Sequence, residues 1–257
     1  MLEWIARGLG KGIVTSRYPH RHEPNPDDFR GSIRVLDTHG ATPELEGVCP
    51  TGAIRVRDGK PAIDRGRCMM CGLCVAADPA RFAFVGDDRN AARSRGSLVV
   101  GDPTPAAVDG SARTLADQSR TLRRSIHVRH VDAGSDGSEE WEISALANPY
   151  YDMQRLGLFF TASPRHADIL LVSGGVTRSM RTPLERAYDV MPQPKAVVAA
   201  GTDACSGGLS AATGETAGGV DKVLPVDIYV PGAPPSPIAL LHGLLLAAGM
   251  LKDGEGR

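Results

Sequence analysis

The chain has 257 residues, of which 42% are hydrophobic and 5% aromatic, and its formal net charge at pH 7 is −1. This length fits one or two domains with a buried core, and the near-neutral charge gives no indication of a nucleic-acid partner. The longest apolar run, Ile238–Leu251, has about 14 residues, too few to span a bilayer.

Residues 1–30 are expected to form a docking arm. An apolar helical face is formed by Leu2, Ile5, Leu9 and Ile13, with Trp4 beside it. Three glycines between residues 8 and 12 weaken a free-standing helix by roughly 1 kcal/mol each. They favour a helix packed on its own domain or on another subunit; a helix lying on a membrane surface is the alternative. Charged residues and the lack of a small-residue cleavage site argue against a signal peptide.

Residues 31–95 contain four of the five cysteines, at a spacing typical of iron–sulfur proteins. Cys68, Cys71 and Cys74 form a C-x-x-C-x-x-C run, and Cys49 lies upstream in a Cys-Pro step. In two-cluster bacterial ferredoxins the fourth cysteine of such a run ligates the other cluster. By that rule these four cysteines complete the ligand set of one 4Fe–4S cluster. Their spacing and the odd cysteine total favour a reducing compartment over disulfides.

The same rule locates a second ligand set, which has lost every cysteine. Its four positions carry His39, Thr42, Leu45 and Asp78. One cluster is therefore complete and the other absent, and we interpret His39 and Asp78 as surface or packing replacements. Met69 and Met70 lie between two ligands and are expected to pack around the cluster, tuning its exposure and potential.

A β-hairpin is predicted between the two halves of this unit. Residues 53–57 form one strand, Asp58-Gly59-Lys60 the turn and residues 61–63 the return strand. We therefore expect 31–95 to be an α+β ferredoxin-like domain. Residues 96–124 are polar, lack a sustained period and are expected to be a linker, interrupted only by the apolar patch at 98–100.

From residue 125 the pattern alternates between strands and helices. Strands are predicted at 125–131, 167–173, 195–200 and 223–230, with helices from Pro183 to Val190 and from Pro237 onward. Such alternation predicts an α/β domain over 125–257, with a mainly parallel sheet covered on both faces. The glycine-rich stretch 201–219 contains no nucleotide-binding fingerprint.

The C-terminal half resembles the small electron-transfer (20 kDa, or B) subunit shared by respiratory complex I and energy-converting NiFe hydrogenases of the formate hydrogenlyase type. The stretches that carry this resemblance are 129–135, 142–146, 148–152, 163–170 and 225–232. The N-terminal third resembles the polyferredoxin subunit of the same hydrogenases, through residues 12–15, 17–19 and 29–31. The chain thus looks like a fusion of two neighbouring subunits, and the resemblance implies a flavodoxin-like second domain.

That small-subunit family holds its own 4Fe–4S cluster, the proximal cluster, through four cysteines. The corresponding positions here carry Asp136, Glu139, Asp203 and Ala233. Cys205 lies two residues beyond the expected position, and we expect it to be a buried thiol. The resemblance therefore implies that the proximal cluster is absent and that the carboxylates of Asp136, Glu139 and Asp203 converge.

Convergent carboxylates in a poorly solvated pocket must share protons, pair with cations or bind a hard metal. We expect a salt-bridge network to fill the old cavity. The nearest candidate cations along the motif are Arg129, His130, Arg178 and Arg181. A site that handles protons or a cation, or a loop that has moved into solvent, are the alternatives.

The resemblance implies an iron–sulfur subunit, not catalytic on its own, of a hydrogenase-like or complex I-like membrane assembly. Its partners would be the large subunit and, through the arm, membrane-embedded subunits. It would lie peripherally on the cytoplasmic side of the inner (cell) membrane, without a transmembrane segment. We expect the second domain to act mainly as a scaffold; an active electron carrier to the large subunit and a stand-alone ferredoxin-type carrier are the alternatives.

Overall fold

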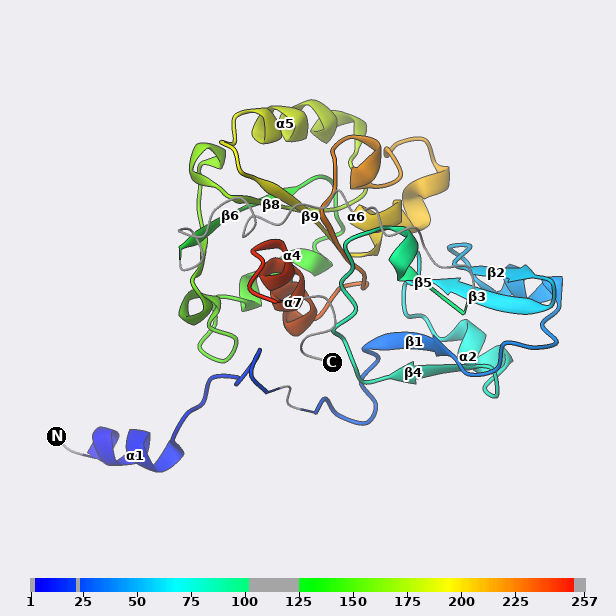
Figure 1. Ribbon diagram of the computed structural model, residues 1–257, viewed down its shortest axis with the longest axis horizontal. Coiled ribbons are helices and arrows are strands. Elements are labelled where there is room, and N and C mark those ends of the chain that lie inside the picture. The colour runs from blue at the N-terminus through cyan, green and yellow to red at the C-terminus, as the bar shows by residue number, and fades with distance from the viewer. Residues whose placement is uncertain (1–2, 22–23, 102–124, 252–257) are drawn as a thin grey trace.

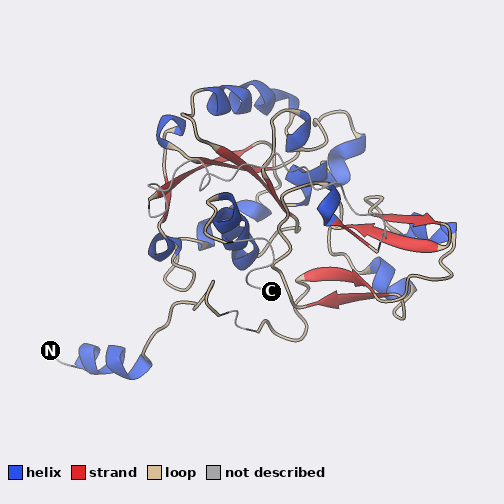
Figure 2. Cartoon of the chain, viewed as in Figure 1, coloured by secondary structure: helices blue, strands red, loops and turns tan. Residues whose placement is uncertain are grey.

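A computed structural model describes residues 3–21, 24–101 and 125–251. Figure 1 shows an α/β domain, a smaller β-rich unit beside it and a helix that projects from the N-terminus. The cartoon in Figure 2 separates the helices from the strands. No helix of the described ranges is long and apolar enough to cross a membrane.

The α/β domain is built on a five-stranded sheet whose strands all run parallel. The strands are β6 (Ile126–Asp132), β7 (Leu158–Phe160), β8 (Ile169–Ser173), β9 (Ala196–Ala200) and β10 (Ile228–Val230). Their spatial order is β10-β9-β8-β6-β7, which is the 2-1-3-4-5 order of flavodoxin-like folds. The predicted parallel sheet is confirmed, although its last strand is shorter than expected.

Helices cover both faces of this sheet because alternate strand residues point to opposite sides. The helices are α4 (Ser138–Ala145), α5 (Arg178–Asp189), α6 (Thr202–Ser206) and α7 (Pro237–Ala247). On one face Ile143 of α4 and most of α7 pack against the core; on the other, Leu184 of α5 and Ala204 of α6 do so. The almost wholly apolar α7 is buried along its length.

The helix predicted to begin at Pro183 begins five residues earlier, so that prediction was wrong. Thr177 precedes the first turn of α5, and its carbonyl accepts hydrogen bonds from the N–H groups of Met180 and Arg181. Pro183 therefore lies inside the helix. The sequence argument failed because it treated proline only as a helix starter.

The smaller unit contains two antiparallel sheets and one short helix. The elements are β1 (Ser32–Val35), β2 (Ile54–Arg57), β3 (Lys60–Asp64), α2 (Leu73–Ala77), β4 (Phe82–Val85) and β5 (Val99–Val100), with a 3-10 helix at Pro43–Val48. Strand β1 pairs with β4, and the predicted hairpin β2–β3 is confirmed, with β5 added to β3. Ile33, Ile54, Ile63 and Phe82 form the core of this unit.

The expected linker at 96–124 begins with ordered elements. Gly96–Leu98 forms a 3-10 helix, Leu98 is buried in the core of the α/β domain, and β5 pairs with β3. The prediction of irregular structure is therefore wrong for residues 96–100. The remainder from 102 to 124 lies outside the described residues.

The N-terminal arm is anchored to the α/β domain by residues 16–18, while its helix is exposed. Helix α1 (Glu3–Lys11) has no buried residue, so it does not pack on the described part of its own domain, and packing on another subunit stays a prediction. Five residues further on, the N–H of Ser16 donates to the carbonyl of Tyr150 (2.7 Å). The buried Tyr18 hydroxyl is 2.6 Å from Nδ1 of His242 in α7. The arm is therefore docked on the α/β domain by residues 16–18 and on the smaller unit by Asn25 and Arg30, and not by its helix.

Candidate cluster site

The four cysteines at 49, 68, 71 and 74 line a single pocket in the β-rich unit. Cys49 ends the 3-10 helix Pro43–Val48, and Cys68 opens the loop that follows β3. Cys74 lies in the first turn of α2. Met70 (φ 56°) and Gly72 (φ 85°) have left-handed backbones, and they turn this loop around the pocket. The structure thus brings all four predicted ligands together.

The walls of this pocket are apolar and favour neutral thiols over bare thiolates. Ile54, Ile63 and Phe84 are among the lining residues. Burial raises the pKa of the Cys68 thiol to about 12 and also raises that of Cys74. Four thiolates could therefore share this pocket only with cations among them, which is what an iron–sulfur cluster supplies.

A backbone N–H donor and a hydroxyl that is able to donate face the sulfur of Cys49. The N–H of Ala53 donates to this Sγ atom at 3.2 Å, and the Thr51 hydroxyl lies 3.4 Å from it. Such donors stabilise negative charge on a ligand sulfur. Among the described residues, no group of three His, Cys, Asp or Glu could hold a single metal ion. The four thiols line one shared pocket.

One arginine joins two of the four positions of the second ferredoxin ligand set, 39 and 78. The Arg81 guanidinium donates to the Asp78 carboxylate (2.8 Å) and to the backbone carbonyl of His39 (2.6 Å). Leu45 packs against the core of the unit. These residues therefore act as packing and ion-pair replacements and offer no sulfur to a cluster.

In the α/β domain, the three predicted carboxylates lie after the carboxyl ends of parallel strands. Glu139 is in α4 and only 3% exposed, with its side chain against Gly201, where an added Cβ would lie 2.4 Å from Oε1. Asp203 lies in the first turn of α6, and Asp136 follows β6. No sulfur is present at these positions, so they do not fit an iron–sulfur cluster.

The electrostatics of these carboxylates differ with their surroundings. Burial raises the pKa of Glu139 to about 7, and the nearby charges of Asp203 and Asp136 add to this effect. Burial also raises the pKa of Asp203. Asp136 has a lowered pKa because the hydroxyl and N–H of Ser138 donate to its carboxylate. Glu139 is therefore the member best suited to hold a proton near neutral pH.

The expected salt-bridge network at this position was wrong. In the described part of the chain, no Lys, Arg or His forms an ion pair with Asp136, Glu139 or Asp203. His130 instead lies 3.6 Å from Glu140 and 2.9 Å from the Ser173 hydroxyl, which donates to Glu140. Arg181 pairs with Glu185 of its own helix. The cost of burying the Glu139 carboxylate is thus avoided by protonation and is not offset by a neighbouring cation.

The remaining cysteine behaves as a buried thiol. Cys205, in α6, is 1% exposed and part of the core on that face of the sheet, and burial raises its pKa to about 12.

The two units meet at the cluster loop through contacts that sequence reasoning missed. The Thr202 hydroxyl donates to the carbonyl of Cys68 (3.0 Å). Arg95 donates to both carboxylate oxygens of Asp64 (2.5 and 2.6 Å) and to the carbonyl of Cys205 (3.1 Å). Ala233, at the fourth lost-ligand position, lines a groove together with the expected cluster neighbours Met69 and Met70. No local pattern marks Arg95 or Thr202, because their partners are distant in sequence.

Comparison with known proteins agrees with this two-part organisation. The family described as "NADH ubiquinone oxidoreductase, 20 Kd subunit" matches residues 137–247, and the family "4Fe-4S single cluster domain" matches residues 62–118. Formate hydrogenlyase subunit 7 of Escherichia coli is 42% identical over 154 residues, 60% of each chain. The probable membrane-bound hydrogenase subunit mbhJ of Pyrococcus furiosus is 40% identical over 135 residues, 52% of this chain and 81% of the relative.

The chain therefore belongs to the NADH ubiquinone oxidoreductase 20 kDa subunit family, and it joins to that domain a 4Fe–4S single cluster domain. It spans 60% of the length of formate hydrogenlyase subunit 7. Among solved structures, it is similar to a chain of the membrane-bound sulfane sulfur reductase, an archaeal respiratory membrane complex. That similarity has a TM-score of 0.45 and 30% identity and covers 52% of this chain and 73% of the other.

Proposed function

We propose that the chain is a peripheral iron–sulfur subunit of a hydrogenase-like or complex I-like membrane assembly, with one 4Fe–4S cluster held by Cys49, Cys68, Cys71 and Cys74. The observation that carries this proposal is the single apolar pocket lined by all four thiols. We assign the pocket to a ferredoxin-like domain over residues 31–95, extended to Val100 by β5. A docking arm (1–30) precedes it, and the α/β domain (125–257) follows.

The cluster, when bound, supplies one-electron exchange, and the chain's own residues set the conditions for it. The Ala53 N–H and the Thr51 hydroxyl stabilise charge on the Cys49 sulfur. The apolar walls exclude water around Cys68. Cys71 is the exposed member of the four, so exchange with a partner is easiest from its side of the pocket.

We propose that the α/β domain serves mainly as a cluster-free scaffold. Asp136, Glu139 and Asp203 offer oxygen and no sulfur at the family's cluster position, and Glu139 fills the space against Gly201. Its partners would be the assembly's large subunit and, through the exposed apolar residues of the arm, membrane-embedded subunits on the cytoplasmic side. This assignment follows from the assemblies named for the relatives.

A second candidate role is electron carriage through the cluster to the large subunit. The specific observation that favours it is the hydrogen bond from Thr202 to the Cys68 carbonyl. This bond brings the loop of the lost proximal site into contact with the loop of the surviving site. The cluster pocket therefore lies close to the position at which the family holds its proximal cluster, beside the large subunit.

The test is analysis of iron and acid-labile sulfide in the anaerobically purified assembly, with EPR before and after dithionite. We expect about four irons per chain and one reducible signal, both lost in Cys71→Ser. Cys205→Ser is the matched control and should keep both. About eight irons from this chain would refute the single-cluster assignment, and no iron would leave a pure scaffold. Oxidation of the cluster by the assembly's substrate would select the carrier role.

A further inference from the structure

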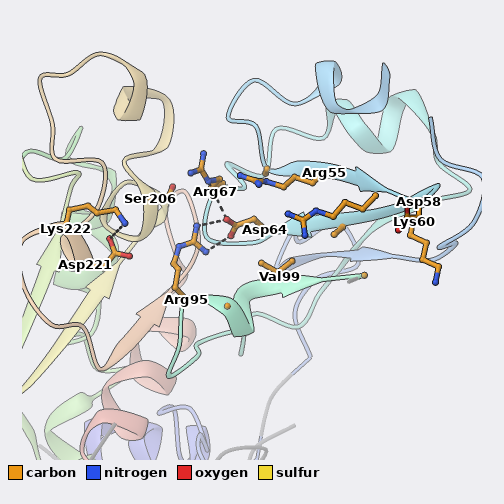
Figure 3. A pocket seen from close by; sticks show the side chains of 15 residues that line it. Arg55, Asp58, Lys60, Asp64, Arg67, Arg95, Val99, Ser206, Asp221 and Lys222 are labelled. Carbon is orange, nitrogen blue, oxygen red and sulfur yellow. Dashed lines mark hydrogen bonds and ion pairs between the residues drawn. The ribbon is translucent and has the colours of Figure 1, made fainter. Parts of the chain in front are cut away.

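A basic groove of about 590 Å³ lies on one face of the β2–β3–β5 sheet, where this sheet meets the α/β domain (Figure 3). Six cationic side chains line it, against three carboxylates. The cations are Arg55, Arg57, Lys60, Arg67, Arg95 and Lys222. The whole chain has a net charge of −1, so this concentration of positive charge is local.

The inner end of the groove is neutralised by its own carboxylates. Arg95 and Arg67 both point toward Asp64, at 2.5 and 3.5 Å (Figure 3). Lys222 lies 3.8 Å from Asp221. These three cations are paired with carboxylates and leave little charge for a ligand, and Arg95 also joins the two units through the Cys205 carbonyl.

The outer end has one carboxylate, Asp58, which forms no ion pair in the described part of the chain. Arg55, Arg57 and Lys60 are exposed, and in the described ranges none of them forms an ion pair with a carboxylate. The hairpin register places Arg57 directly opposite Lys60, and like charges at such positions destabilise a hairpin. An anion bound between them would remove this repulsion.

The groove recognises its ligand through side chains and not through strand addition. Although β2 is an edge strand, the N–H of Val56 already donates to the Glu46 carboxylate at 2.6 Å. Small residues, among them Ala62 and Gly101, hollow the floor. Ala53 also lines the groove, and its N–H donates to the sulfur of Cys49. The groove and the cluster pocket therefore share a wall.

We propose that this groove docks a carboxylate-rich segment of a partner protein beside the cluster. The inference rests on the proposed function, because that function places a cluster beside the groove. The charge pattern of the groove does not depend on it. Among the described residues no aromatic side chain lines the groove, so these residues offer a nucleotide base nothing to stack on. The sheet also lies at the opposite end of the molecule's longest axis from α1 (Figure 1), away from the arm that is the candidate for membrane contact.

The experiment measures fluorescence anisotropy of a labelled octaglutamate peptide on the anaerobically purified full-length chain. We expect binding that weakens as salt is raised and that falls roughly tenfold in R55E/R57E. The matched control R165E/R186E changes the net charge equally at two exposed arginines that do not line the groove. It should retain wild-type binding.

Three results would overturn the proposal. The first is equal binding of octaglutamate by R55E/R57E and by the control. The second is binding to vesicles of phosphatidylcholine and phosphatidylserine that needs Arg55 and Arg57 while octaglutamate does not bind. The third is tight, groove-dependent binding of inorganic pyrophosphate without binding of the peptide. Iron content and EPR of the same samples report on the cluster separately, so failure of the cluster assignment and failure of the docking site remain distinguishable.

Discussion

At the scale of single residues, Glu139 is a buried titratable group at a position where the resemblance to the small-subunit family implies a cysteine. Glu139 is 3% exposed and packs against Gly201, and burial raises its pKa to about 7. The folded state therefore favours the protonated carboxyl. Its contribution to stability is complete below the ordinary glutamate pKa of 4.5 and is lost as pH rises through about 7.

We predict that Glu139→Gln will be about as stable as the wild type at low pH and more stable above neutrality, by about 3 kcal/mol. Gln keeps the shape but cannot ionise. Urea unfolding of both proteins at about pH 5 and about pH 8 measures the difference, and Glu215→Gln controls for loss of an exposed carboxylate. A stability difference that does not change with pH would contradict the role given to burial.

A second prediction concerns the Thr51 hydroxyl beside the Cys49 sulfur. Removing a donor from a ligand sulfur destabilises the reduced, more negative cluster. Thr51→Val should therefore lower the reduction potential by about 40 mV, as expected for a bond of about 1 kcal/mol in a one-electron couple. Thr51→Ser keeps the hydroxyl and should keep the potential. A redox titration followed by EPR measures the reduction potential of each variant. An unchanged potential in the valine variant would show that the Thr51 hydroxyl does not influence the cluster.

At the scale of elements, the predictable parts of the fold are those with a local signal. Strands β8 and β9 are continuous apolar runs, and the hairpin β2–β3 has an Asp-Gly turn, so each was found. Strand β5 was missed because its two valines lie in a polar stretch and pair with β3, more than thirty residues earlier in the sequence. The cysteine set followed from spacing alone. The contact between the cysteine loop and α6 could not be predicted in this way, because Thr202 and Arg95 bind partners that are distant in sequence.

Arg95 is the element-scale link that can be tested most directly. It joins Asp64 at the end of β3 to the backbone at Cys205 in α6, and both charged side chains are largely buried. Arg95→Met should destabilise the chain by about 2 kcal/mol, because it leaves the Asp64 carboxylate without its bidentate partner. The double variant that adds Asp64→Asn should lose less free energy of unfolding, measured in urea, than the sum of the losses in the two single variants. Strict additivity would show that the pair is not coupled.

At the scale of the whole molecule, the exposed apolar side of α1 is the feature without a partner in the described chain. Trp4, Leu9 and Ile13 are 71%, 80% and 77% exposed. We predict that L9E/I13E will shift the chain from washed membranes to the soluble fraction while its iron content stays unchanged. Each glutamate makes burial of that side costly. Equal membrane retention of the variant and the wild type would show that attachment uses another surface.

The anchoring of residues 16–18 also fixes how far α1 can reach. Arg155 donates to the carbonyls of Ser16 and Tyr18 (2.9 and 3.1 Å), so the chain is held on both sides of residue 17. From Lys11 to Ser16 an extended backbone spans at most about 17 Å. Helix α1 is thus connected to the anchored residues by a short segment. The near end of α1 therefore stays within about 17 Å of Ser16, and its 9 residues add about 14 Å. A partner that binds the helix within this reach also limits how the α/β domain can be oriented toward it.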